Sequence, residues 1–395
     1  MTSMFEELQR AVANGDKAKL VELLAQGADI NGKLANGYGL LHWVAHLGDT
    51  AGADLLLANG INPDWDMQND QGTTPLDIAV NQGRKEMVAY LIAKGANFNT
   101  KDKPGESTPL HRAAQCAHTE IAELLVISGA NVNARNRDGI TPLHCATWRG
   151  YASYQTIVKL LLAHDADVNA ADKSGRTPLF NAVAAGNKGL LGLLCKHGAD
   201  IGVTDKAGTN LLLHAASEEL LGSINYLIKS GIDINSQDGQ GLTVLHWAAA
   251  RGNRKLIEAV LSQGAKADMQ DKKGRTPLHK AAYQGYGGIV EILLEQDGVN
   301  INATDNEGAT PLHLVVEKVE YLSAEDTEAL NEKVEGIVEE FNARAKGKRK
   351  VIALLIARGA DVSAKDKNGN TALGIAIKDK KRDIVMLLKA HGAKG

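Results

Sequence analysis

Residues 271–285 read DKKGRTPLHKAAYQG, and this stretch decides the fold. Thr276 is a favourable N-cap residue, and Pro277 suits the first helical position because the amide hydrogen that it lacks would have no partner there. The helix is expected to end at Gly285, since glycine adopts the left-handed conformation of a helix end at little cost. Between these two signals, a leucine and two alanines form a narrow apolar face that a neighbouring helix can approach closely.

The same pattern, D-x-x-G-x-T-P-L-H-x-A-A-x-x-G, returns along the whole chain of 395 residues, each time followed by an apolar segment and a form of G-A-D-V-N. The leucine of the pattern marks its register. Neighbouring register leucines are 33 to 36 residues apart, except for one step of 61. These leucines are Leu8, Leu41, Leu76, Leu110, Leu143, Leu179, Leu212, Leu245, Leu278, Leu312 and Leu373.

A period of about 33 residues with a T-P-L-H-x-A motif resembles the ankyrin-repeat family. The resemblance covers nearly the whole chain and implies an all-α solenoid of about eleven stacked helix-turn-helix units with protruding β-turn tips. A single unit would expose its apolar faces, so stability must come from neighbouring units, and polar residues near both chain ends are expected to cap the stack. The predicted parts are an N-terminal capping repeat (1–33), central repeats (34–316), a charged helical insertion within the tenth repeat (317–350), and the rest of that repeat with a C-terminal capping repeat (351–395).

The composition argues against several classes of protein. A net charge of −3 gives no general attraction to nucleic acid or to anionic lipid. The three cysteines lie far apart without a C-x-x-C pair, which encodes neither a disulfide framework nor a zinc site and indicates a reducing compartment. The N-terminus lacks the apolar core of a signal peptide, and no apolar run is long enough to span a membrane. We therefore expect a cytoplasmic or nuclear protein, or one in a host cytosol if it is a microbial effector.

Six histidines occupy the same position of the pattern, but they do not form a metal site. Successive units are separated by roughly 10 Å, the usual helix-packing distance, which is too far for a shared coordination sphere. We expect these side chains to form hydrogen bonds near helix N-termini and the adjoining loops. They are His42, His111, His144, His246, His279 and His313, here called the motif histidines. No G-x-x-x-x-G-K-S/T, H-E-x-x-H or G-x-S-x-G motif occurs, so we expect no cofactor and no enzyme.

A few units depart from the pattern. Asp77 replaces the histidine of the third unit, and Asn210 begins an N-L-L-L sequence in place of T-P-L-H in the seventh. The fifth unit has about three extra residues around Tyr154. Small insertions in loops are well tolerated, so these departures represent either sequence drift or a local contact site.

The long step in the tenth unit contains an acidic segment followed by a basic one. Residues 317–345 hold nine acids and three bases, and residues 346–350 read KGKRK. Helical spacing of apolar residues predicts an amphipathic helix, which either packs on the stack or forms a partner-binding arm. Its apolar residues are Leu330, Val334, Ile337, Val338 and Phe341, with Ser323 and Asp326 in an N-capping arrangement. The KGKRK stretch is expected to be a solvated turn, with a nuclear-import signal as the alternative.

The resemblance to ankyrin repeats also implies where a partner would bind. In such proteins partners lie along the concave side and contact the turn tips and the exposed end of the first helix. The matching tip residues are Tyr38, Arg137, Arg176, Lys272 and Arg275, and the matching helix-end residues are His46, Trp148, Arg149, Arg251, Tyr283 and Gln284.

Aromatic and arginine side chains are the types most enriched at interface hot spots, and the basic turns favour an acidic protein partner. Trp148 has a second interpretation, in which its ring stacks on the insertion around Tyr154. We therefore expect a monomeric, non-catalytic scaffold that acts as an adaptor, inhibitor or regulator. The alternatives are an effector delivered into a host cell by a microbe and a protein that binds nucleic acid through the basic turns.

Overall fold

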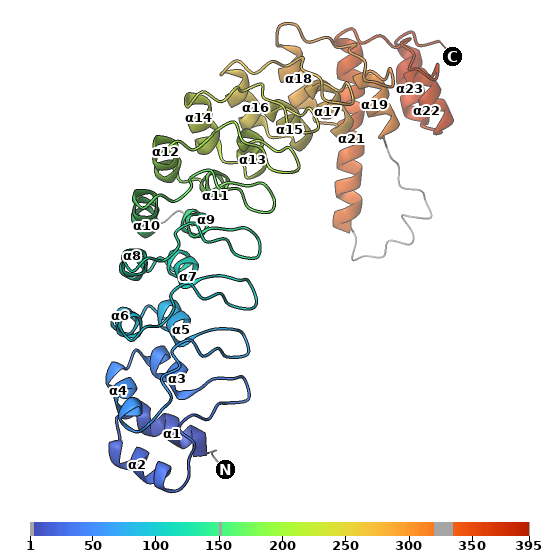
Figure 1. Ribbon diagram of the computed structural model, residues 1–395. Coiled ribbons are helices and arrows are strands. Elements are labelled where there is room, and N and C mark those ends of the chain that lie inside the picture. The colour runs from blue at the N-terminus through green and yellow to red at the C-terminus, as the bar shows by residue number, and fades with distance from the viewer. Residues whose placement is uncertain (1–3, 150–151, 320–334, 395) are drawn as a thin grey trace. The chain divides into compact units, whose positions relative to one another are not determined.

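The computed structural model describes residues 4–149, 152–319 and 335–394 (Figure 1). Within these ranges the regular elements are helices, with isolated β-bridges between Lys33 and Gly39 and between Lys365 and Thr371. The predicted all-α repeat solenoid is therefore confirmed. Contacts divide the chain into two units, residues 1–206 and 207–395, and each is described by itself.

In the first unit the helices follow one another in pairs, one pair for each repeat of the sequence pattern. These pairs are α1 (Met4–Ala13) and α2 (Lys17–Ala25), α3 (Leu40–Leu47) and α4 (Thr50–Ala58), α5 (Pro75–Asn81) and α6 (Lys85–Ala93), α7 (Pro109–Gln115) and α8 (Thr119–Ile127), α9 (Pro142–Thr147) and α10 (Ala152–Ala163), and α11 (Pro178–Ala184) and α12 (Lys188–Lys196). Each first helix from α3 to α9 packs against the first helix of the next pair.

The second unit repeats this arrangement. Its helices are α13 (Leu211–Ser217) and α14 (Leu221–Lys229), α15 (Val244–Arg251) and α16 (Arg254–Leu261), α17 (Pro277–Gln284) and α18 (Gly287–Leu294), α19 (Pro311–Glu317) and α21 (Glu335–Ala357), and α22 (Ala372–Lys378) and α23 (Arg382–Ala390). The core of both units consists of leucine, isoleucine, valine and alanine side chains buried between neighbouring helices. In the last pair Ile377 and Met386 are 50% and 73% exposed, so the outer surface of this pair is not wholly polar.

The motif quoted first folds as its residues predict. Thr276 is the N-cap of α17, Pro277 occupies the first helical position, and Gly285 ends the helix with a φ of 84°. The Thr276 N–H donates to Nδ1 of His279 at 3.1 Å, so the histidine side chain closes the start of its own helix.

Each motif histidine also reaches the following repeat. Because Nδ1 accepts a hydrogen from a backbone amide, it carries no proton of its own, and Nε2 must carry the ring hydrogen. Nε2 donates this hydrogen to a backbone carbonyl of the next repeat at 2.9 to 3.1 Å. The acceptors are the carbonyl oxygens of Thr73, Ile140, Arg176, Arg275, Ala309 and Asn370. The predicted hydrogen-bonding role of the motif histidines is therefore confirmed.

The turn tips are joined to one another by backbone hydrogen bonds. The Lys272 N–H donates to the Gln240 carbonyl at 2.9 Å, and the Asn306 N–H donates to the Lys273 carbonyl at 2.8 Å. Within the tip, the carboxylate of Asp271 accepts the N–H groups of Lys273 and Arg275. Equivalent bonds link the tips of the first unit. The tips therefore form an ordered edge along each unit.

The long helix α21 corrects one expectation. Residues 346–350 lie within this helix, so the expected solvated turn is wrong. Its basic side chains hold neighbouring elements: Lys348 Nζ donates to the Lys318 carbonyl at the end of α19 at 2.5 Å, and Arg349 pairs with Asp383 at 2.7 Å. Gly347 permits a close approach, because a Cβ there would lie 3.1 Å from the Gly285 carbonyl oxygen.

Part of the predicted insertion lies outside the described residues. This applies to Ser323, Asp326, Leu330 and Val334. From Glu335 onward the chain is helical and runs without a break into the second helix of the tenth repeat. The domain boundaries and the choice between a packed helix and a partner-binding arm stay predictions.

Burial of the motif histidines makes stability depend on pH. Burial lowers the pKa of His42, His111 and His279 from 6.5 to about 4, and it also lowers the pKa of His144 and His246. Between pH 6.5 and pH 4 these histidines are protonated in the unfolded chain but remain neutral in the folded chain. The free energy of unfolding must therefore fall as the pH falls from 6.5 towards 4. The loss is roughly 3 kcal/mol for each histidine with a pKa near 4.

This dependence can be measured by urea denaturation at pH 7, 6, 5 and 4.5. The His279→Gln variant, which has one titrating ring fewer, should show a slope reduced by about one proton. A free energy of unfolding that stays constant across this range would contradict the assignment of buried, neutral histidines.

Candidate protein-binding groove

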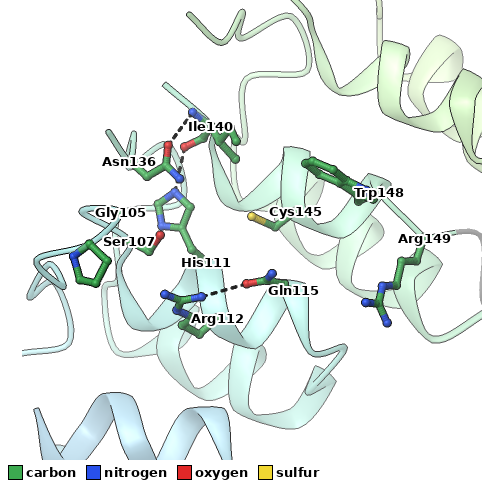
Figure 2. Close-up of a pocket in the computed structure, with 11 residues that line it drawn as sticks. Gly105, Ser107, His111, Arg112, Gln115, Asn136, Ile140, Cys145, Trp148 and Arg149 are labelled. Carbon is green, nitrogen blue, oxygen red and sulfur yellow. Dashed lines mark hydrogen bonds between the residues drawn. The ribbon is translucent and has the colours of Figure 1, made fainter. Parts of the chain in front are cut away.

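A pocket of about 470 Å³ opens between the fourth and fifth repeats, beside α7 and α9 (Figure 2). We call it the Trp148 pocket. Its lining includes Pro104, Arg112, Gln115, Cys145, Trp148 and Arg149. Figure 2 places Trp148 and Arg149 on one side of the opening and Arg112 with Gln115 on the other. Two of the residues predicted to bind a partner, Trp148 and Arg149, therefore lie at one hollow.

Trp148 is the C-cap residue of α9 and remains 65% exposed. Part of the insertion around Tyr154 lies outside the described residues, so stacking of Trp148 on it stays a prediction. Tyr154 itself is only 5% exposed, and its hydroxyl donates to the Gln115 carbonyl at 2.9 Å. This hydrogen bond links α10 to the end of α7. Tyr154 thus joins two repeats, while the indole of Trp148 stays exposed.

The charges around the pocket are unevenly balanced. Arg112 pairs with the buried carboxylate of Asp102 at 2.6 Å and donates to Gln115 Oε1 at 3.2 Å. Burial alone would raise the pKa of Asp102, but the N–H of Ser107 and the Arg112 guanidinium hold it below its ordinary value. Arg149 is exposed and makes no hydrogen bond or ion pair with the residues that the structure describes. The local excess charge is therefore positive.

Cys145 also lines this hollow. Burial raises the pKa of its thiol to about 12, so the thiol stays protonated near neutral pH. Because the thiolate is the nucleophilic form of cysteine, this residue has no activated nucleophile to offer. Its place in the pocket is that of a small apolar side chain.

The other predicted arginines are engaged within the chain. Arg176 pairs with Asp205 at 3.4 Å and Arg275 with Asp305 at 3.0 Å, and each of these aspartates begins the next turn. Arg137 donates to the Lys103 carbonyl at 2.8 Å. These side chains hold neighbouring turns together, so less of their charge is available to a partner than the sequence suggested.

The remaining predicted residues are spread over both units. In the first unit, the Tyr38 ring lies 5.1 Å from that of His42, and His46 stacks on Trp43 at 6.0 Å. In the second unit, Arg251 lies over the Trp247 ring at 5.2 Å, Lys318 lies over the Tyr283 ring at 5.4 Å, and Lys272 and Gln284 are exposed. None of these residues lines the Trp148 pocket.

Arg112, Gln115 and Pro104 line the pocket but were not predicted from the sequence. A usable signal was present, because Arg112 and Cys145 both occupy the variable position of T-P-L-H-x-A. That position is only half-buried in these repeats, whereas the leucine, histidine and alanines around it are buried. A side chain at x therefore faces the pocket.

Comparison with known proteins gives the family. A family model described as ankyrin repeats (3 copies) matches residues 8–102, 102–172, 151–238, 212–305 and 245–332. The chain therefore belongs to the ankyrin-repeat family. Ankyrin repeats generally mediate protein–protein interaction, and proteins built from them are typically non-catalytic scaffolds.

The chain also resembles part of a toxin. The chain is 34% identical over 99 residues to delta-latroinsectotoxin-Lt1a of Latrodectus tredecimguttatus. The match covers 24% of this chain and 8% of that protein, so the chain spans a small part of its relative's length. Among the described residues, no helix has the length and apolar character needed to cross a membrane.

The protonated state of Cys145 predicts slow alkylation. In a variant with Cys116→Ser and Cys195→Ser, iodoacetamide should label Cys145 at pH 8 at least roughly a hundredfold more slowly than it labels free cysteine, because little thiolate is present. Mass spectrometry of the intact protein follows the reaction. Labelling in 6 M urea serves as the control, and a native rate equal to that of free cysteine would contradict a neutral thiol.

Proposed function

We propose that this chain is a non-catalytic scaffold that binds a partner protein at the Trp148 pocket. The observation that carries the proposal is the position of Trp148, which is 65% exposed at the rim of a hollow of about 470 Å³. Trp148 is the only tryptophan among the exposed large apolar side chains of the described residues. An exposed indole beside a pocket is typical of a binding surface, since the folded chain gains nothing from leaving it in water.

The charge of the pocket supports an acidic segment as its occupant. Arg149 has no acidic neighbour to neutralise it in the described part of the chain, whereas the charge of Arg112 is already matched by Asp102. An incoming carboxylate would pair with Arg149 while an apolar or aromatic neighbour on the same segment packs against Trp148. Electrostatic complementarity of this kind mainly speeds association, and the buried indole supplies most of the affinity.

The state of the titratable groups supports binding without turnover. Both ring nitrogens of each motif histidine are already hydrogen-bonded, so these rings are not available as general bases. The Cys145 thiol is not activated either. The chain would then act only by binding its partner, as an adaptor, an inhibitor or a regulator.

The proposal can be tested with two matched double variants. In the first, Trp148→Ala and Arg149→Glu remove the indole and reverse the charge at the pocket. In the second, Ile127→Ala and Lys159→Glu make the same kind of change at exposed positions of α8 and α10 outside the pocket. Each protein is used to capture partners from lysate treated with nuclease, and the captured proteins are quantified by mass spectrometry.

We expect the pocket variant to lose the captured partner by at least roughly tenfold, while the control variant keeps it. The segment of the recovered partner that contacts this chain should be acidic. Equal capture by both variants, or capture that disappears with nuclease treatment in the unmodified protein, would contradict the proposal.

A further inference from the structure

The third repeat interrupts the series of motif histidines. Asp77 stands at the histidine position of α5 and reproduces half of the histidine's function: its Oδ2 accepts the Thr74 N–H and the Thr74 hydroxyl, both at 2.9 Å. The start of α5 is therefore capped as in the other repeats.

The other half of the function is lost. A carboxylate accepts hydrogen bonds but cannot donate one, so Asp77 cannot bind the carbonyl oxygen that precedes the next repeat's threonine. That oxygen belongs to Ser107, and among the described residues it accepts only the Asp102 N–H, at 3.1 Å. Oδ1 of Asp77 has no hydrogen bond within the same residues.

A pocket of about 340 Å³ lies beside this carboxylate, and we call it the Asp77 pocket. Its lining includes Tyr38, Asp77, Ile78, Asn81, Asp102 and Arg112. Asp77 is only 5% exposed, and Ile78 beside it is 4% exposed. The pocket thus has a deeply buried carboxylate in its wall, where other repeats carry an imidazole ring.

The charges of the lining leave Asp77 without a counter-charge. Asp102 is matched by Arg112 at 2.6 Å, so these two groups cancel. The remaining lining side chains are uncharged. A buried carboxylate without a cation is unfavourable, which is why burial raises the pKa of Asp77 to about 6. A cation in the pocket would remove this cost.

We propose that the Asp77 pocket binds the cationic group of a basic side chain, with Oδ1 of Asp77 as its acceptor. A guanidinium or ammonium group has N–H donors and a positive charge, which are the two features that the pocket lacks. An anion is disfavoured because Arg112 is already bound by Asp102 and Gln115, and Asp77 repels it. This inference goes beyond the proposed function, since it does not require that the Trp148 pocket be occupied.

The test uses the full chain with isoleucine methyl groups labelled with carbon-13. The Ile78 methyl signal reports on the Asp77 pocket, and the signal of Ile127, which is 71% exposed on α8, is the reference. Methylguanidinium chloride is added in steps, with sodium chloride and sodium acetate in parallel titrations at equal ionic strength. We expect a saturable shift of the Ile78 signal with methylguanidinium alone and no shift of the Ile127 signal.

Two substitutions separate charge from shape. Asp77→Asn keeps the size and the capping acceptor but removes the charge, and it should weaken methylguanidinium binding by roughly tenfold or more. Asp77→His restores the T-P-L-H motif, replaces the carboxylate acceptor with a neutral imidazole and supplies the missing donor to the Ser107 carbonyl. It should abolish binding while the thermal midpoint rises or stays unchanged.

Three results would overturn the proposal. One is an Ile78 signal that does not respond to methylguanidinium, and another is an equal response to acetate. The third is unchanged binding in Asp77→Asn. None of these results bears on the Trp148 pocket, so failure here is distinguishable from failure of the proposed function.

Discussion

A neutral imidazole, hydrogen-bonded at both nitrogens, links each repeat that carries a motif histidine to the repeat after it. Nδ1 of His279 accepts the Thr276 amide at the start of α17, and Nε2 donates to the Ala309 carbonyl in the next turn. Local helix capping and contact between repeats thus depend on one side chain. The bond also fixes the tautomer, because only a ring with its hydrogen on Nε2 can make both interactions. In these repeats the alanines of the first helix, such as Ala281 and Ala282, are also buried, which lets neighbouring first helices approach.

The same constraint explains where function can arise. The leucines and alanines of each repeat are buried against neighbours, and the threonine, proline and histidine are needed to begin the helix. What remains free to vary is the x of T-P-L-H-x-A, the end of the first helix and the turn. Arg112 and Cys145 at x, with Trp148 and Arg149 at a helix end, form the Trp148 pocket. Asp77 shows the complementary case, in which a motif position itself changes and a carboxylate lines a pocket in place of an imidazole.

The sequence predicted the repeated structure well because each helix is specified locally. Thr276, Pro277 and Gly285 mark the two ends of α17 without reference to any other part of the chain. Features that depend on neighbouring repeats were harder to predict. The pairing of Arg176 with Asp205 joins two turns 29 residues apart in sequence. It neutralises a positive charge that the sequence predicted to be available for binding a partner. The KGKRK stretch was expected to be a turn because its charges suggested solvent, whereas Lys348 and Arg349 bind the neighbouring elements of the stack.

The candidate site was predicted only in part for the same reason. Trp148 and Arg149 could be chosen from residue type and position, but the hollow beside them depends on the side chains of α7. The substitution at Asp77 was visible in the sequence, but the pocket beside it could not be predicted, because its lining combines side chains of three neighbouring repeats.

The most direct test of this account is the tautomer of the motif histidines. A long-range ¹H–¹⁵N correlation spectrum of the full chain at pH 7 distinguishes a protonated nitrogen from a bare one in each ring. The account predicts six neutral rings with the hydrogen on Nε2. Motif histidines that are charged, or that carry the hydrogen on Nδ1, would contradict the hydrogen bonds on which the stack depends.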